Sequence, residues 1–410
     1  MTTDSAVDAK KPRPGLDGQT FLVGDLVYIR AVDPADAEFG TALAATIFPK
    51  STNWLENWIK EELPKAERTG YYVIVRKRDD QPVGRLTTHR WEQLTQLHPW
   101  IDPLLGEQGQ RYLAEAMRLV APWLIDEQHR LNLRVQLTAD QTLAAAALEE
   151  VGAREVARFP EMFRVSGGRA DGLVYEYLNR QWIERLGDPA NIELPRTGTG
   201  EPRPVQPPVM PEGDPPANAV RLGARVYLRP LTKADYEQDA FWSLRDPETF
   251  WDAGRWPASA IAWAGIEERN QKEERPGWVR FAVCLRENDE VIGALGISDI
   301  DYLHGHAETE SAMFRAEYRG GGYGSEAKQL LLDYAFNTLN LHSLQSFVIF
   351  PNTRSAAALR KQGYREVGRA HWSFSSFGLF ENFVVFNLLA ADWRALPRIA
   401  PGEREEERGA

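Results

Sequence analysis

Three groups of residues occur twice in this chain of 410 residues, in the same order on either side of a proline-rich stretch. The paired groups are Val27–Arg30 with Val226–Arg229, Tyr72–Val75 with Phe281–Cys284, and Ala145–Val156 with Ala356–Val367. Chance could produce one such match, but three in one order indicate a duplicated domain, with a period too long for a solenoid. The chain is therefore predicted to fold as two similar domains, each with its own core.

Prolines crowd the segment 187–219 between the two copies, with glycines among them and little apolar periodicity. Such a segment cannot bury a core, and we expect an extended, semi-rigid linker. The two domains are then predicted at 18–186 and 220–398. The ends of the chain, 1–17 and 399–410, are predicted to be a flexible N-terminus and a disordered acidic tail.

Composition narrows the classes of function. Apolar residues make up 43% of the chain and charged residues 26%, as in globular proteins. The single cysteine, Cys284, excludes a disulfide framework, and His304 and His306 have no further ligands at metal-site spacing, so no metal is expected. A net charge of −11 argues against nucleic-acid binding and suits a cationic substrate only weakly, since it serves solubility equally. No apolar run has the length of a membrane span or signal peptide, and we expect a cytoplasmic protein.

The second copy has the clearer pattern of elements. Short β-type runs precede a glycine-rich loop, and apolar residues recur at helical spacing after it. Glu287–Asp289 indicates a hairpin turn, and Gly363 indicates the left-handed end of a helix. The expected strands are 226–229, 281–285, 291–297, 307–314, 343–350, 365–374 and 383–388, with helices directly after the loop and over 354–362. This order predicts an α/β or α+β fold around one mixed sheet.

The loop Arg319–Gly324 lies between an expected strand and an expected helix N-terminus. Glycines bring backbone N–H groups close to an anion, and a helix N-terminus adds free donors and partial positive charge. Taken alone, the pattern is equally typical of a surface turn. A nucleotide P-loop is excluded because Ser325-Glu326 follows the last glycine where Lys-Ser or Lys-Thr is required. Although Gly322–Ala327 fits the dinucleotide pattern G-x-G-x-x-A, it does not open a βαβ unit.

Several motifs in family order resemble the GNAT superfamily of N-acetyltransferases, and most closely its branch that acetylates ribosomal-protein N-termini. They are Ala307–Phe314, Glu317–Ala327, Leu332–Phe336, Asn352–Ser355 and Gly363-Tyr364, framed by Leu228–Leu231 and Leu388–Trp393. The resemblance covers residues 220–396. It implies two tandem GNAT folds, each a mixed, mostly antiparallel sheet flanked by helices. It also implies acetyl-CoA as co-substrate and a primary amine, of a small molecule or a peptide N-terminus, as acceptor.

The resemblance also assigns cofactor-binding residues. The family motif R/Q-x-x-G-x-G/A maps onto Arg319, Gly322 and Gly324, so that backbone amides of the loop would hold the CoA pyrophosphate. In the family the fourth strand diverges from the fifth, and free backbone groups there bind the pantetheine arm. The implied set is Ala312, Met313, Phe314, Arg319, Gly320, Gly321, Gly322, Tyr323, Gly324, Ser325 and Asn352.

Direct acyl transfer from a thioester to an amine needs a base for the amine and stabilisation of the oxyanion. Glu308 matches the family's general base. Glu310, two residues on and facing the same way, is the alternative, beside a mechanism through water alone. The backbone N–H of Met313 or Phe314 would polarise the thioester carbonyl.

The residue that would donate a proton to the departing thiolate differs from the family pattern. The usual tyrosine is replaced by Leu359, and Ser355, in the first turn of the same helix, is the expected substitute, although a structural role there is nearly as credible. No covalent enzyme intermediate is required, so Cys284 is expected to pack in a strand.

The first copy lacks these functional residues. Aligned backwards from the shared repeat, its loop becomes Leu104–Gly109, which has a leucine for the arginine and a glutamate that would repel a pyrophosphate. Gln141 and Ala144 replace Asn352 and Ser355, and Gln93 or Thr95 replaces Glu308. We expect this domain to keep the fold without catalysis, to pack against the second domain and to shape the acceptor site. Mycothiol synthase is a family precedent for two such domains in one chain.

The sequence is also compatible with other functions. A non-catalytic acyl-CoA-binding or scaffold protein is the main alternative, followed by a transferase for longer acyl groups, and a homodimer is possible in either case. The acceptor side is crowded with tryptophans that would hold a cation or form core, namely Trp242, Trp251, Trp256, Trp263 and Trp278.

Overall fold

The computed structural model describes residues 14–40, 49–91, 94–193, 200–243, 260–376 and 379–399. They divide into two compact units. The first comprises Met1–Arg158, Ala170–Glu193 and Arg369–Asn382, and the second comprises Phe159–Arg169, Leu194–Gly368 and Phe383–Ala410. Each unit therefore includes a short segment from the opposite half of the sequence. The expectations for the first 13 residues, the tail from residue 400, Gln93, Trp251 and Trp256 lie outside the described residues, as does the side chain of Trp242.

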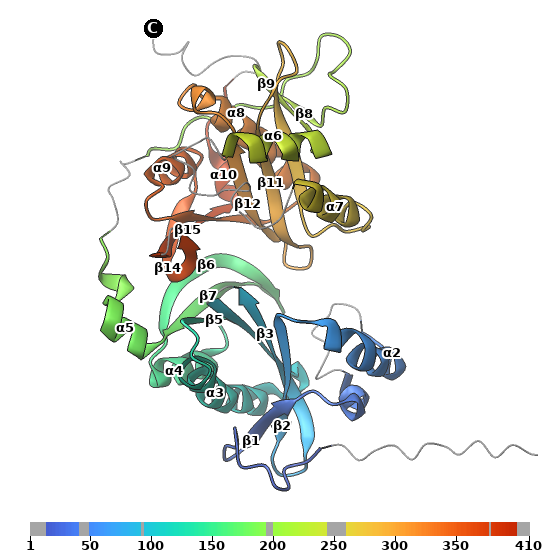
Figure 1. The fold of residues 1–410 in the computed structure, drawn as a ribbon, viewed down its shortest axis with the longest axis vertical. Coiled ribbons are helices and arrows are strands. Elements are labelled where there is room, and N and C mark those ends of the chain that lie inside the picture. The colour runs from blue at the N-terminus through green and yellow to red at the C-terminus, as the bar shows by residue number, and fades with distance from the viewer. Residues whose placement is uncertain are drawn as a thin grey trace, which may run out of the picture. The chain divides into compact units, whose positions relative to one another are not determined.

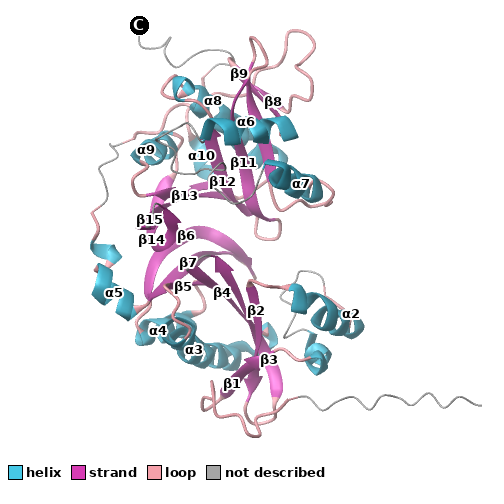
Figure 2. Cartoon of the chain, viewed as in Figure 1, coloured by secondary structure: helices cyan, strands magenta, loops and turns pink. Residues whose placement is uncertain are grey.

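The first unit is a mixed sheet flanked by helices. Its strands are β1 (Val27–Ala31), β2 (Thr69–Arg76), β3 (Gln81–Trp91), β4 (Leu94–Ile101), β5 (Asn132–Thr138) and β7 (Gly168–Leu178), in the order β1-β2-β3-β4-β5-β7, and β6 (Arg154–Val165) precedes β7 in the chain. Neighbouring strands are antiparallel except β4 and β5, which are parallel. The helices are α2 (Thr52–Asn57), α3 (Gly106–Pro122), α4 (Thr142–Val151) and α5 (Arg180–Leu186). Figure 2 shows α3 and α4 together on one side of the strands and α2 on the other.

The second unit repeats this arrangement. Its strands are β8 (Arg221–Leu222), β9 (Val226–Pro230), β10 (Val279–Leu285), β11 (Val291–Asp301), β12 (His306–Met313), β13 (Ser343–Ile349) and β15 (Leu379–Leu389), in that order across the sheet, with β14 (Arg365–Ser376) before β15 in the chain. Only the β12–β13 pair of this series is parallel among the described pairings. The helices are α6 (Lys233–Ser243), α7 (Ala260–Asn270), α8 (Tyr323–Asp333), α9 (Thr353–Lys361) and α10 (Ala390–Ala395). Helices α6 and α7 lie over one face of strands β9 to β12 (Figure 1).

These elements confirm the strands and helices expected for the second copy, and they confirm a mixed, mostly antiparallel sheet. The hairpin turn between β10 and β11 places Asp289 in the left-handed region at φ 60°, and Gly363 follows α9 at φ 92°. Buried apolar residues of α8, including Leu330 and Leu331, pack with strand residues such as Leu295 and Ile297 in one core. The alternation of strands and the one-sided apolar face of α8 therefore position the glycine loop at the edge of a rigid core.

Matching contacts recur in the two halves. A bidentate ion pair joins Arg30 to Asp36 at 2.7 and 2.8 Å, and another joins Arg229 to Asp235 at 2.8 and 2.9 Å. A π-helical turn follows α3 at Trp123–Glu127 and follows α8 at Tyr334–Thr338. The repeat seen in the sequence thus extends to side-chain networks and to local helix irregularities.

The proline-rich segment differs from the expected spacer. Val205 is 1% exposed and belongs to the core of the second unit. The backbone N–H of Arg203 donates to the Lys361 carbonyl at 2.8 Å, and that of Val205 donates to the Pro397 carbonyl at 2.7 Å. The prediction that no part of this segment is buried is wrong for Val205, because a valine between prolines still gains free energy by leaving water.

Each exchanged segment places buried side chains in the unit that it joins. In the second unit, Met162 is 2% exposed, and the Gln345 side-chain amide donates to its sulfur at 3.7 Å. In the first unit, the buried Glu176 carboxylate accepts from the backbone N–H and contacts the ring of His371. Arg134 completes that cluster with an ion pair to Glu176 at 2.7 Å. Within the described residues, no helix combines the length and apolar character needed to cross a membrane.

Candidate active site

Strands β12 and β13 separate halfway along their length. They pair in parallel only at His306–Glu308, opposite Ser343–Gln345, while β12 continues to Met313 and β13 to Ile349. The opening therefore begins directly after Glu308. Backbone groups beyond it on the β13 side of β12 lack a strand partner, and such groups can bind an extended chain.

Along β12, the backbone N–H and C=O groups of successive residues point alternately toward β11 and toward this opening. The Phe314 N–H donates to the Ile292 carbonyl of the neighbouring β11 side at 3.0 Å. By the period of two, Ala312 also directs its backbone groups to β11, whereas Ser311 and Met313 direct theirs to the opening. The expectation that the Phe314 N–H polarises a carbonyl is thus wrong, because that donor is already used. Ser311 was missed in the sequence, since the register of the ladder is needed to assign it.

The glycine loop ends on α8. Gly320 and Gly322 have φ values of 83° and 81°, a region that favours glycine, and Gly322 caps α8 without a side-chain hydrogen bond. The N–H groups of Tyr323, Gly324 and Ser325, in the first turn of α8, have no carbonyl partner within the helix. Gly321 lies between these two left-handed glycines, and the loop ends at a helix N-terminus with free N–H donors, a feature that favours anion binding.

Arg319 and Arg225 hold the loop in place. The Arg319 guanidinium donates to the Met313 carbonyl at 2.9 Å, which joins the loop to the end of β12. Arg225 donates to the Gly321 carbonyl at 2.8 Å and stacks over the Tyr323 ring at 4.4 Å. Its backbone N–H and guanidinium both bind the buried Glu326, at 2.7 and 3.0 Å. Arg225 was missed in the sequence because it lies far from the loop and outside any motif.

Glu308 and Glu310 differ in their surroundings although they share one face of β12. Glu310 forms an ion pair with Arg280 at 2.6 Å. Among the described residues, the side chain of Glu308 forms no hydrogen bond or ion pair. Burial, together with the nearby charges of Asp299 and Glu310, raises the pKa of Glu308 to about 8, while the charge of Lys328 acts to lower it. The carboxyl group of Glu308 is thus unpaired among the described residues, and it lies where β12 and β13 begin to separate.

Two of the tryptophans expected on the acceptor side, Trp263 and Trp278, lie close to the side chain of Arg280. The Arg280 guanidinium lies 5.8 Å from the Trp263 ring and 5.7 Å from the Trp278 ring. The Trp278 indole N–H donates to the buried Glu267 at 2.8 Å. These two rings therefore support the Arg280–Glu310 pair.

Asn352 and Ser355 lie together at the N-terminus of α9. The Asn352 side-chain oxygen accepts the Ser355 backbone N–H at 3.1 Å, so Asn352 is the N-cap of the helix. Ser355 is half-buried in the first turn. Leu359, at the position of the missing tyrosine, is 5% exposed and packs in the core.

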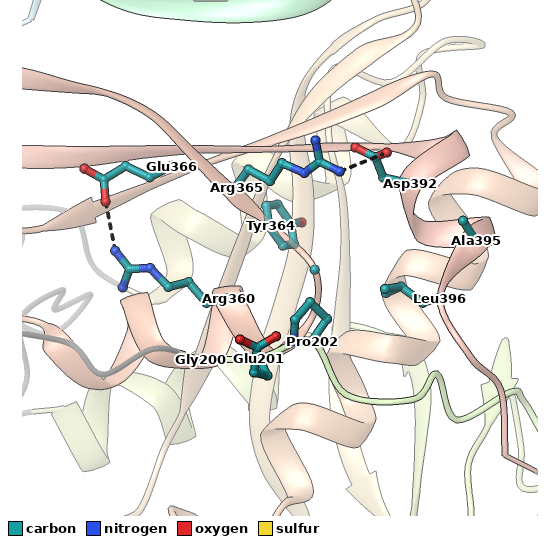
Figure 3. A pocket seen from close by; sticks show the side chains of 11 residues that line it. Gly200, Glu201, Pro202, Arg360, Tyr364, Arg365, Glu366, Asp392, Ala395 and Leu396 are labelled. Atoms are coloured by element: carbon teal, nitrogen blue, oxygen red, sulfur yellow. Dashed lines mark hydrogen bonds and ion pairs between the residues drawn. The ribbon is translucent and has the colours of Figure 1, made fainter.

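A cavity of about 410 Å³ lies away from these groups. It is formed by Gly200–Pro202, by the turn after α9 and by the end of α10, and Figure 3 shows ion pairs of Arg360 with Glu366 and of Arg365 with Asp392 at its rim. No residue predicted for the active site lines it. Both arginines in its walls are already paired with carboxylates, and we assign it no role.

The first repeat differs at the positions equivalent to Glu308, Arg319, Gly322 and Gly324, and the structure changes two of the sequence alignments. In the parallel pairs, Gln96 lies opposite Arg134 as Glu308 lies opposite Gln345, so Gln96 replaces Glu308, instead of Gln93 or Thr95. Glu115 accepts the N–H groups of Leu26 and Val27 as Glu326 accepts those of Arg225 and Val226.

That equivalence places the first repeat's counterpart of the loop at Gln108–Leu113, and not at Leu104–Gly109. Helix α3 already begins at Gly106, so the amides from Gln110 onwards bond within the helix. The row of free donors seen in the second repeat is therefore lost. The alignment went wrong because the gap lies in a loop, where the sequence carries no periodic signal to fix it.

Comparison with known proteins agrees with this geometry. Residues 225–365 match the acetyltransferase (GNAT) domain family. "Uncharacterized N-acetyltransferase p20" of Bacillus licheniformis is 33% identical over 114 residues, 28% of this chain and 64% of that protein. Spermidine N(1)-acetyltransferase of Escherichia coli (strain K12) is 30% identical over 95 residues, 23% of this chain and 50% of that protein. The chain thus spans between half and two thirds of the length of these relatives.

Among solved structures, spermidine N-acetyltransferase from Vibrio cholerae in complex with CoA and spermine is 19% identical with a TM-score of 0.35. The match covers 42% of this chain and 99% of that one.

Proposed function

We propose that the second repeat is an acetyl-CoA-dependent N-acetyltransferase that transfers an acetyl group to a primary amine by direct attack. The observation that carries the proposal is Glu308, an unpaired carboxyl with a raised pKa, at the point where β12 and β13 separate. The GNAT match over residues 225–365 covers this point and the glycine loop. We propose that the first repeat is a degenerate GNAT fold without catalysis, since its loop is helical and Gln96 replaces the base.

The residues present fit acetyl-CoA as co-substrate. The positive φ of Gly320 and Gly322 and the free N–H groups at the start of α8 suit a pyrophosphate. The backbone groups of Ser311 and the N–H of Met313, which face the strand opening, suit the amide groups of a pantetheine arm. Bound there, acetyl-CoA supplies an activated acyl carbonyl next to Glu308. Asn352 is proposed to contact the arm from the N-terminus of α9.

Glu308 is proposed to accept the proton that the acceptor amine must lose. A carboxyl whose pKa is about 8 is protonated at low pH and becomes a base as the pH rises through that value. Glu310 is unsuited to this task because Arg280 holds it in an ion pair. Ser355 is proposed as the proton donor to the departing thiolate, in place of the tyrosine that Leu359 replaces.

The acceptor class that we propose is a primary amine of a small molecule or of a peptide N-terminus. The spermidine acetyltransferases among the relatives act on a small polyamine, which supports the first of these. Acetylation of ribosomal-protein N-termini is the second form of the proposal. A panel holding spermidine, simple monoamines and short peptides separates them.

Replacing Glu308 tests the proposal. Acetyl-CoA-dependent release of CoA thiol, measured with an amine panel, should fall about a hundredfold or more in Glu308→Gln because the general base is lost. Glu310→Gln is the matched control, since it removes a carboxylate from the same strand face, and it should fall far less. Unchanged turnover in Glu308→Gln would exclude this residue as the base.

A non-catalytic acyl-CoA-binding or scaffold protein is the alternative, favoured by the absence of the usual tyrosine at Leu359. The unfolding temperature measured with and without CoA distinguishes some of these functions. A ligand at a hundred times its Kd should stabilise the fold by about 2.7 kcal/mol. Stabilisation without turnover on the panel would favour the binding protein, stabilisation by longer acyl-CoA alone would favour a different acyl donor, and no stabilisation would contradict all three.

A further inference from the structure

Three buried hydroxyl groups meet where β12 and β13 separate. The Thr309 hydroxyl donates to the Gln345 carbonyl at 3.3 Å and lies 3.0 Å from the Tyr364 hydroxyl. The Ser346 hydroxyl donates to the Thr309 carbonyl at 3.2 Å. The side chains of Thr309, Ser346 and Tyr364 are all buried. These hydroxyl groups therefore bond within the protein, and they lie at the closed end of the strand opening.

The Ser346 hydroxyl takes the place of a backbone donor. Thr309 directs its backbone groups toward β13, because alternate residues of β12 do so. In a parallel ladder, such a residue bonds to the two residues that flank its partner. One more pair would therefore let the Phe347 N–H donate to the Thr309 carbonyl. That carbonyl accepts the Ser346 hydroxyl instead, and the described ladder ends one residue earlier, at Glu308 and Gln345.

The first repeat shows the same fold without these hydroxyl groups. By the register and the sequence repeat, its residues at the three positions are Leu97, Val135 and Ala153, which are all buried in an apolar core. There the parallel pairing continues by one residue, and Leu97 lies opposite Val135. The corresponding pair, Thr309 with Ser346, is absent from the described ladder of the second repeat. With apolar residues at this point, the strands thus separate one residue later.

The point of separation decides how far a bound arm can extend between the strands. The glycine loop follows the far end of β12, so an arm held there runs back along β12 and its acyl end reaches the closed end of the opening. One strand residue spans about 3.3 Å. A ladder longer by one pair would shift the acyl carbonyl away from Glu308 by about that distance, and a misplacement of about 1 Å can already cost a hundredfold in rate.

We propose that Ser346 is a positioning residue, whose hydroxyl ends the parallel ladder directly after Glu308 and so places the acyl carbonyl of the bound thioester beside that base. This role rests on the proposed function, because it acts on the co-substrate proposed there. By the period of two, the side chain of Thr309 lies on the opposite face of β12 from that of Glu308, so the acceptor side of the site is left open. Since Ser346 lies at the other end of the opening from the glycine loop, it affects the rate of transfer more than the affinity for the co-substrate.

The kinetics of Ser346→Val and Ser346→Thr are the first test. The two new side chains have nearly the same shape, but only threonine keeps the hydroxyl, and any cost of the added bulk is common to both. With the amine that the panel identifies, kcat should be about tenfold or more lower in Ser346→Val than in Ser346→Thr, while the KM for acetyl-CoA stays within about threefold. Equal kcat values, or a difference that appears only in KM, would overturn the proposal.

A second measurement does not depend on turnover. Hydrogen exchange at the Phe347 amide, followed by mass spectrometry without acyl-CoA, reports whether the ladder has grown. Exchange should be about tenfold or more slower in Ser346→Val than in Ser346→Thr, because the Phe347 N–H gains the Thr309 carbonyl as an acceptor. If exchange differs in this way while no amine is acetylated, the proposed function fails and the role of Ser346 in the ladder holds. Equal exchange in two variants that unfold at the same temperature contradicts that role whatever the activity.

Discussion

At the scale of single residues, two adjacent glycines of the loop offer a matched pair of substitutions. Gly322 has φ 81°, and a methyl group there would lie 2.9 Å from the Arg225 guanidinium. Gly321 has no such φ, and its methyl group would make an ordinary contact of 3.4 Å with the Tyr323 ring. Gly322→Ala should weaken CoA binding about tenfold, since a left-handed alanine costs about 1–2 kcal/mol. Gly321→Ala should stay within about twofold in the same calorimetric titration, and equal losses would refute the conformational argument.

The same residues show what a sequence can specify at this scale. The glycine loop was recognisable because glycine alone tolerates the backbone angles that Gly320 and Gly322 adopt. Glu308 and Glu310 could not be separated, since two residues on one strand face look alike in sequence. Arg280, from another strand, distinguishes them by pairing with Glu310. Arg225 gave no signal because its role depends on which elements pack together.

At the scale of elements, the buried Glu326 connects α8 to the start of β9 and, through Arg225, to the loop. Glu326→Gln should therefore weaken CoA binding about fivefold or more and lower the free energy of unfolding by about 1–3 kcal/mol. Arg221→Ala is the control, because the Arg221–Asp333 pair joins β8 to the far end of α8 at 2.8 Å without touching the loop. It should reduce stability with little change in CoA affinity. Binding that falls equally in both variants would show general destabilisation instead of a loop effect.

Elements themselves were largely predictable, because apolar residues at strand and helix spacing fix their type and approximate bounds. Their registers were not. The first-repeat counterparts of the loop and of Glu308 were misplaced by a few residues, and the parallel pairing of Gln96 with Arg134 corrected the second of them. An insertion before α3 is compatible with several alignments, and hydrogen bonds such as those of Glu115 choose one.

At the scale of the whole molecule, sequence predicted two copies but not the exchange of segments between them. Phe159–Arg169 belongs to the second unit and Arg369–Asn382 to the first. A strand hairpin has the same local pattern whichever sheet receives it, so no periodicity reveals this choice. The buried side chains Met162 and His371 reveal it only through their contacts.

The exchange predicts that neither half folds fully without the other. A fragment of residues 194–410 lacks Met162 and Phe159, which are each 2% exposed in the second unit, and leaves the Gln345 side chain without its partner. Removing two large buried side chains should lower its unfolding temperature by about 5 °C or more. Co-expressed fragments 1–193 and 194–410 should copurify, because each supplies the segment that the other needs. The control is the full chain with a protease site between Glu193 and Gly200, cut after folding, which keeps both segments in place and should unfold near the uncut chain. Independent fragments that match this nicked chain in unfolding temperature would show that the exchanged segments contribute nothing to stability.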